Sequence, residues 1–189
     1  MALILFNKPF QVMCQFSPHA SRPTLADHID LPGIYPAGRL DADSEGLLLL
    51  TDDGALQSRI SHPAHKAAKT YLVQVEGIPE RDQLARLRLP IDLGDFTTLP
   101  CKAIRVEAPD WLWSRQPPIR ERAAIATSWL AIVLAEGKNR QVRRMTAHVG
   151  LPTLRLVRIA IGPFSLTSHP LLPGEYCDVS PALLDAAAA

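Results

Sequence analysis

The stretch that decides the fold of this 189-residue chain is Gly38-Arg39-Leu40-Asp41-Ala42-Asp43-Ser44-Glu45-Gly46-Leu47-Leu48-Leu49-Leu50-Thr51. Its first half is a loop rich in carboxylates, and its second half is a leucine run with the length of a buried strand. A buried strand gives the loop before it a base that does not move. Rigid support of this kind is expected around a catalytic acid or nucleophile, so the stretch predicts a functional acidic loop.

The acidic loop is open to three other interpretations. Asp41, Asp43, Glu45 and Asp52 approach the spacing of a calcium-binding EF-hand, but the prolines and glycines of residues 32–38 do not permit the helix that must enter it. Two of these carboxylates could serve a glycoside hydrolase, although residues so close in sequence rarely face each other across a sugar. The last interpretation is a solvated turn that only joins two elements.

The composition predicts a globular protein, with 47% hydrophobic residues and a net charge of +1. A nucleic-acid-binding protein usually has a clear basic excess. The charges are unevenly placed, however, because residues 41–53 contain five acids and no base. Residues 137–158 contain no acid, and their basic residues are Lys138, Arg140, Arg143, Arg144, Arg155 and Arg158. The near-neutral total therefore hides an acidic and a basic pole.

Cysteines and apolar runs bear on location and metal content. The cysteines are Cys14, Cys101 and Cys177, and their wide spacing predicts reduced thiols in a cytoplasmic protein without disulfides or zinc. His62 and His65 lie close together, but no third ligand accompanies them. The apolar start is too short for a signal peptide, and no run is long enough to cross a membrane. We therefore expect no metal and no membrane partner.

The pattern of the chain predicts an α+β fold with a mixed, mostly antiparallel sheet and helices around it, because strands and helices do not alternate regularly. Thr24 is expected to cap a short helix. The clearest helix spans residues 139–149, with Val142, Met145 and Val149 on one face and arginines on the other. The expected strands are residues 2–6, 47–51, 70–75, 99–106, 129–134 and 154–161, and the other expected helices are residues 24–29, 54–60 and 79–87.

Four motifs of this chain resemble those of the RsuA/RluB/RluE/RluF group of pseudouridine synthases. Asn7-Lys8-Pro9-Phe10 is similar to the N-terminal motif of the group, with Phe10 where glycine is usual. Tyr35-Pro36-Ala37-Gly38-Arg39-Leu40-Asp41 resembles its central motif. The other two motifs are Lys69-Thr70-Tyr71 and Glu136-Gly137-Lys138-Asn139-Arg140-Gln141-Val142-Arg143-Arg144-Met145. The resemblance covers nearly the whole chain, up to residue 176.

The resemblance implies an enzyme that turns uridine in RNA into pseudouridine, with three catalytic residues. Asp41 would attack C1′ of the ribose or assist formation of a glycal intermediate. The target base must leave its stack, and Tyr71 would stack on it. Arg143 would pair with Asp41, since a guanidinium stabilises an ionised carboxylate at any relevant pH. An isomerisation of this kind requires no cofactor.

The resemblance also implies a partner and an architecture. We expect a central active-site cleft in one catalytic domain over residues 1–189, without the S4 RNA-binding domain of many relatives. The expected substrate is large-subunit ribosomal RNA, free or in an assembling subunit, bound by a monomer. A non-catalytic RNA-binding or ribosome-assembly protein is the alternative. The residues expected to contact the RNA backbone are Lys8, Arg39, Lys138, Arg140, Arg144, Arg155 and Arg158.

Overall fold

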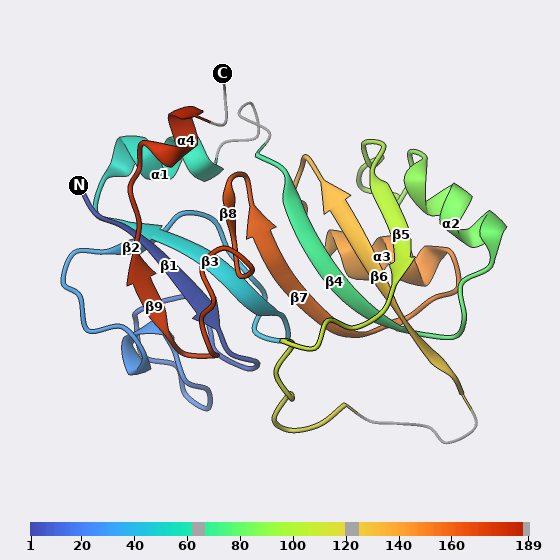
Figure 1. Ribbon diagram of the computed structural model, residues 1–189, viewed down its shortest axis with the longest axis horizontal. Helices are drawn as coiled ribbons and strands as arrows, with labels where there is room; N and C mark the ends of the chain where they lie inside the picture. The colour runs from blue at the N-terminus through green and yellow to red at the C-terminus, as the bar shows by residue number, and fades with distance from the viewer. Residues whose placement is uncertain (62–66, 120–124, 187–189) are drawn as a thin grey trace. The chain divides into compact units, whose positions relative to one another are not determined.

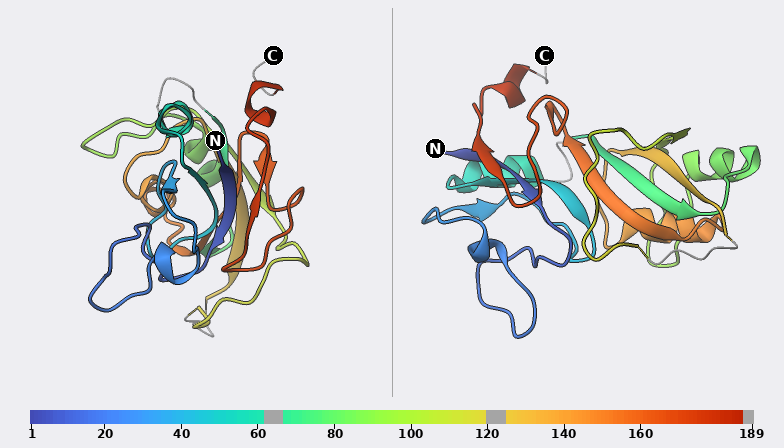
Figure 2. Two further views of the ribbon diagram at one scale, coloured as in Figure 1. Left: turned by 90° about the vertical axis from the view of Figure 1, so that its left-hand side faces the viewer. Right: turned by 60° about the horizontal axis from the view of Figure 1, so that its bottom comes forward.

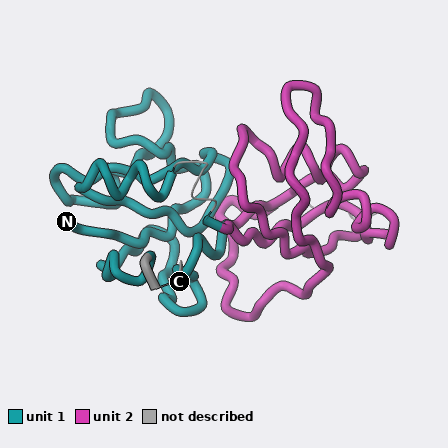
Figure 3. Tube along the Cα trace, turned by 90° about the horizontal axis from the view of Figure 1, so that it is seen from above, with its two compact units in different colours: residues 1–67, 158–189 teal, residues 68–157 magenta. Residues whose placement is uncertain are grey.

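The computed structural model describes residues 1–61, 67–119 and 125–186. The chain divides into two compact units, shown in different colours in Figure 3. The first unit consists of residues 1–67 and 158–189, and the second of residues 68–157. No helix in the described part of the chain is long and apolar enough to span a membrane.

Strand β3 (Glu45–Thr51) is the leucine run and lies at the centre of the first unit. It pairs antiparallel with β1 (Leu3–Lys8) in a register that places Leu3 opposite Thr51. Every residue of both strands is buried, so the pair is covered on both faces. Alternate residues point to opposite faces of a sheet, and the cluster packed on one of these faces includes Ile4, Phe6, Leu25, Ile29, Leu48 and Leu50.

Shorter elements surround this pair in the first unit. The chain between β1 and β2 (Tyr35–Pro36), drawn in blue in Figure 2, contains the 3-10 helix η1 (Leu25–Asp27). Thr24 caps η1 in a capping box with Asp27, as the sequence predicted. The remaining elements are α1 (Gly54–Ser61), the end of β7 (Thr153–Ile161), β8 (Phe164–Ser165), β9 (Tyr176–Asp178) and α4 (Leu183–Ala186). Strand β2 pairs with β3, β9 with β1, and β8 with β7, all antiparallel.

The sheet of the second unit has the strand order β5-β6-β4-β7 (Figure 1). Its strands β4 (Lys69–Glu76) and β5 (Lys102–Val106) both pair antiparallel with β6 (Thr127–Leu134). The start of β7 completes the sheet. The helices are α2 (Arg81–Arg88), which contacts β5, and α3 (Gln141–His148).

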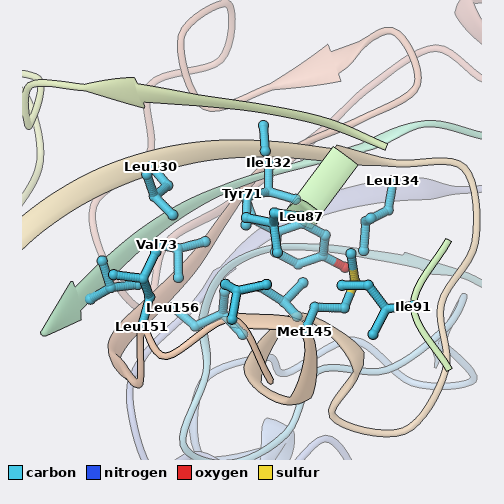
Figure 4. Packing of buried hydrophobic residues seen from close by; sticks show 14 residues of the cluster. Tyr71, Val73, Leu87, Ile91, Leu130, Ile132, Leu134, Met145, Leu151 and Leu156 are labelled. Carbon is cyan, nitrogen blue, oxygen red and sulfur yellow. The ribbon is translucent and has the colours of Figure 1, made fainter. Parts of the chain in front are cut away.

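The core of the second unit forms where α3 packs on the sheet. Residues of β6 alternate between buried and more exposed positions, as expected for a sheet with one well-covered face. Helix α3 contributes Val142, Met145 and the following Val149, the face predicted from its periodicity. The same cluster, shown in Figure 4, also includes Tyr71, Val73, Leu87, Leu130, Ile132 and Leu156.

The structure confirms the predicted α+β class and most of the predicted elements. Strand β1 runs through Lys8, two residues beyond the expected end of the first strand at residue 6. No strand was expected around Tyr176, but β9 begins there by pairing with β1. The short strands β2 and β8 were not predicted, because two residues carry no periodicity.

Candidate active site

The acidic loop before β3 is held mainly through its backbone. The carbonyl of Asp41 accepts a hydrogen bond from the Ser44 amide at 3.0 Å, which closes a tight turn. The next carbonyl, that of Ala42, accepts from the Gln11 amide at 2.7 Å. Asp41 itself is partly exposed, whereas Ser44 and Glu45 are buried. The loop therefore presents Asp41 from a backbone that is bonded on both sides of it.

Two buried cations, Lys8 and Arg158, add further bonds to this loop. The Lys8 amine donates to the carbonyls of Pro9 at 2.8 Å and Val12 at 2.9 Å, and more weakly to that of Ala42 at 3.5 Å. Arg158 donates from Nε to the Leu47 carbonyl at 2.8 Å. Its Nη1 donates to the Arg39 carbonyl at 3.3 Å, so Arg158 links the loop to β3.

Burial determines the ionisation of Lys8. It lowers the pKa of the Lys8 amine to about 8, against the opposing effect of Cys14, Glu45 and Asp43. The Arg158 charge lowers this pKa further. An amine buried in this way needs hydrogen-bond acceptors around it, which the backbone carbonyls supply.

A close backbone approach explains Gly46 at the start of β3. Its φ of 104° lies in the left-handed region that favours glycine. A Cβ at this position would lie 2.2 Å from the carbonyl oxygen and 2.9 Å from the nitrogen of Arg158. Only a residue without a side chain allows the chain at Arg158 to pass so close to the acidic loop.

The turn after β1 accommodates the departure from the N-terminal motif. Positive φ falls on Gln11, at 67°, and not on Phe10. Phe10 therefore does not need the conformational freedom of the glycine that is usual there.

Tyr71 lies on β4 in the second unit and is 7% exposed. Its ring packs among Leu87, Ile132 and Met145 (Figure 4). It is therefore a member of the core as well as a candidate for base stacking, and only a small part of it is accessible.

Arg143 lies on α3 in the same unit and is partly buried. Its neighbours Val142 and Met145 belong to the core cluster that contains Tyr71, so packing joins the elements that carry these two candidates. Asp41, in contrast, belongs to the first unit.

A network of polar contacts shapes the loop before α3. The Glu136 carboxylate accepts from the Leu99 amide at 2.7 Å and from Gln141 Nε2 at 2.6 Å. Gln141 is buried, and its Oε1 accepts from the Lys138 amide at 3.0 Å. Arg140, at the N-cap of α3, has a φ of 50°, an uncommon conformation for a residue with a side chain. This network sets the direction in which α3 begins.

Arg144 is committed to contacts within the second unit. Its Nη1 donates to Asp95 Oδ2 at 3.1 Å, its Nη2 donates to Asp95 Oδ1, and Nη2 also donates to the Leu93 carbonyl at 2.6 Å. The hydrogen bond from Arg144 lowers the pKa of the Asp95 carboxyl. The Arg144 guanidinium also lies 5.0 Å from the centre of the Phe96 ring, and Lys138 Nζ lies 5.9 Å from it. Phe96 therefore joins the loop of residues 92–98 to the cations around α3.

Apart from Arg144, the predicted RNA contacts divide into two groups. Arg39, Lys138 and Arg140 are exposed, and their role stays a prediction. Lys8, Arg155 and Arg158 are 0%, 6% and 4% exposed, so little of each side chain is accessible, and their role in RNA binding also stays a prediction. A phosphate contact needs an accessible cation, whereas Lys8 and Arg158 bond to backbone carbonyls. The Arg155 guanidinium lies 5.7 Å from the centre of the Trp113 ring.

Metal binding finds no support among the described residues, which contain no group of three or more His, Cys, Asp or Glu side chains arranged for a metal ion. The pair His62 and His65 lies outside the described residues.

Comparison with known proteins identifies the family. Residues 2–148 match the family described as RNA pseudouridylate synthase. The chain belongs to this family. It is 52% identical over 178 residues to ribosomal large subunit pseudouridine synthase E of Vibrio vulnificus, covering 94% of this chain and 75% of the relative. It is 53% identical over 176 residues to the enzyme of that name from Xanthomonas campestris, covering 92% and 93%. The resemblance drawn from the motifs is thereby confirmed.

Solved structures agree with this family membership. A crystal structure of a pseudouridylate synthase matches with a TM-score of 0.79 at 30% identity, covering 98% of this chain and 73% of the other. Human RNA pseudouridylate synthase domain containing 1 matches with a TM-score of 0.58 at 15% identity, which shows a shared fold and no more.

Sequence reasoning missed the residues that support the family's third motif. Gln141 was quoted only as part of that motif, yet it is the buried centre of the network before α3. Its position four residues before Met145 places both on one face of the helix and could have indicated its burial. Asp95 lies 49 residues before its partner Arg144, with Phe96 next to it, and no local pattern connects them with α3.

Proposed function

We propose that this enzyme converts a uridine of large-subunit ribosomal RNA to pseudouridine. The proposed substrate is supported by relatives named ribosomal large subunit pseudouridine synthase E, which are 52% and 53% identical over nearly all of this chain. The observation that carries the chemistry is the anchored loop of Asp41, whose backbone is fixed by Gln11, Lys8 and Arg158. A carboxylate that reacts at a sugar carbon requires such fixed placement.

The proposed reaction is an isomerisation within one nucleotide. The bond from N1 of uracil to C1′ breaks, the base turns, and a bond from C5 to C1′ forms. C5 loses a proton and N1 gains one, so the atoms balance without a cofactor. Asp41 acts at C1′, either by forming a bond to it or by assisting a glycal intermediate.

Tyr71 and Arg143 have supporting roles in this proposal. The flipped uracil needs a flat surface, and the accessible part of Tyr71 provides one above the core of the second unit. Arg143 provides a permanent positive charge for the Asp41 carboxylate. Its backbone is held in α3, which the Gln141 network orients at its start.

The RNA backbone is bound by the exposed cations Arg39, Lys138 and Arg140. The enzyme acts as a monomer in the cytoplasm, on free ribosomal RNA or on an assembling large subunit.

The proposal is tested by incubating the protein separately with large-subunit RNA, small-subunit RNA, transfer RNA and large-subunit precursor particles, and then mapping pseudouridines. We expect modification of one or very few uridines, confined to the large-subunit RNA or its particles. Modification confined to transfer RNA would reject the substrate and keep the chemistry. No modification of any of these would favour the non-catalytic RNA-binding alternative.

A further inference from the structure

The connection between β5 and β6 places a tryptophan at the surface. The Leu112 amide donates to the Pro109 carbonyl at 3.0 Å, which closes a turn. Trp111 lies within this turn and is 41% exposed. An exposed indole is a large apolar and aromatic surface that water solvates poorly.

Two arginines contact residues 113–118 of this connection. Arg115 donates from Nε to the Pro117 carbonyl at 2.8 Å and from Nη2 to the Pro118 carbonyl at 2.9 Å. Trp113 is partly buried, and the Arg155 guanidinium stands over its ring. Trp113, two residues after Trp111, is therefore held against β7 by Arg155, which lowers the entropy cost of ordering this segment on binding.

The charges of the chain indicate what would cover Trp111. The net charge is only +1, and three of the seven cations predicted to contact RNA are buried. A fourth, Arg144, is paired with Asp95. A protein with few available cations needs another source of RNA affinity. Stacking of a base on an aromatic side chain adds RNA affinity without requiring net charge.

We propose that Trp111 stacks on an unpaired base of the RNA substrate, as a binding site separate from the residues assigned to the reaction. This inference rests on the proposed function, since it takes RNA as the ligand. The contact is tolerant of base identity, because every base has a π-face. It favours RNA with an unpaired nucleotide, since the bases of a duplex are stacked on each other and offer no free face.

The test measures binding of a fluorescent oligouridylate of about ten nucleotides, with an RNA duplex of equal length as the second probe. The proteins are the wild type, Trp111→Ala, Trp111→Phe and Ile104→Ala, the last removing another exposed apolar side chain, on β5. We expect Trp111→Ala to weaken oligouridylate binding about five-fold or more, and Trp111→Phe and Ile104→Ala to bind much as the wild type does. Duplex binding and the salt dependence should stay unchanged in Trp111→Ala, because stacking releases no counterions.

The inference is overturned if the wild type does not bind oligouridylate, if Trp111→Ala binds it equally well, or if Ile104→Ala causes the same loss. If Trp111 contacts a protein partner and not RNA, Trp111→Ala should bind oligouridylate as well as the wild type does. Pseudouridine formation in large-subunit RNA by the wild type is measured in parallel. Failure there, together with a binding loss specific to Trp111→Ala, would reject the proposed function and keep the stacking site. Normal pseudouridine formation by the wild type, together with unchanged oligouridylate binding in Trp111→Ala, would keep the proposed function and reject the stacking site.

Discussion

Nη1 of Arg144 lies 3.1 Å from Oδ2 of Asp95, so the second of two consecutive arginines on α3 is neutralised inside its own unit. The first, Arg143, is the one that we propose to stabilise the Asp41 carboxylate. Adjacent residues on a helix point about 100° apart, and the Asp95 contact uses this separation. Through Arg144, this contact fixes the rotation of α3 about its axis. The same rotation sets the direction in which Arg143 points.

The salt dependence of RNA binding should separate Arg140 from Arg144. Each phosphate contact releases counterions, so Arg140→Ala should lower the slope of log affinity against log salt by about 1. Arg144→Ala should leave the slope unchanged, because Asp95 already neutralises this side chain. Binding is measured by titration of large-subunit RNA at several salt concentrations. Equal reductions in the two variants would contradict the assignment and restore Arg144 as a phosphate contact.

Asp41→Asn should abolish pseudouridine formation while the protein stays folded and binds RNA. The amide keeps the size of the side chain but cannot act as an anionic group at C1′. Asp43→Asn, two residues away in the same loop, is the matched control and should be far milder. Mapping of pseudouridine in treated RNA gives the measurement. Substantial turnover by Asp41→Asn would remove Asp41 from the mechanism, and equal loss in both variants would revive a paired-carboxylate reaction.

Tyr71→Phe should separate the contribution of the Tyr71 ring from that of its hydroxyl group. Because the ring packs in the core, phenylalanine should keep both the fold and the RNA affinity, and a fall in kcat would then report the hydroxyl. Tyr71→Ala is less informative, since removal of a buried aromatic ring costs about 3–5 kcal/mol of stability. Single-turnover kinetics and thermal unfolding are measured together. Loss of RNA affinity in Tyr71→Phe at unchanged stability would contradict this division.

Gly46→Ala should destabilise the first unit by at least about 2 kcal/mol, since it combines a positive φ with overpacking. The added Cβ would meet the backbone of Arg158, which cannot rotate away as a side chain could. Gly54→Ala is the control, because a Cβ at the start of α1 meets nothing within 4 Å. Denaturant titration should show Gly54→Ala to be as stable as the wild type or slightly more so. Equal stability of the two variants would show that the close approach at Gly46 relaxes freely.

Lys8 should make stability depend on pH in the alkaline range. Its folded pKa of about 8 lies below the ordinary value of 10.5, so the folded protein holds this proton more weakly than the unfolded chain does. The resulting penalty is fully present below pH 8 and is relieved as the pH rises from about 8 toward 10.5. The free energy of unfolding of the wild type should therefore rise over this range relative to Lys8→Met, which keeps the chain length without the amine. A difference between the two proteins that stays constant over this range would contradict the lowered pKa.

The elements that the sequence predicted well are those with long, regular patterns. The leucine run of β3 and the periodic face of α3 carry their burial in the local sequence, and both were found where expected. The capping box of η1 was likewise readable from Thr24 and its surroundings. Strand β9 is defined by pairing with β1, which is distant in sequence, and β2 has only two residues, so local propensity predicted neither of them.

The residues of the candidate site were likewise predictable only in part. Motif resemblance located Asp41, Tyr71 and Arg143, and their catalytic roles remain predictions. Charge counting did not predict the burial of Lys8, Arg155 and Arg158, because the sequence does not tell whether a cation meets water, a carbonyl or an aromatic ring. That distinction depends on tertiary contacts.

The amide of Gln141 has consequences for which substitutions this position tolerates. Its oxygen accepts a hydrogen bond from the Lys138 amide while its nitrogen donates one to Glu136, so the two ends are not interchangeable. Glutamate has the same shape but would bring a second carboxylate against Glu136, and methionine would remove both hydrogen bonds and leave Glu136 with the one from the Leu99 amide. Asparagine is one methylene too short to span them. The substitutions that this position tolerates are therefore limited by which end of a single amide carries the hydrogens. Size or hydropathy alone would not reveal this restriction.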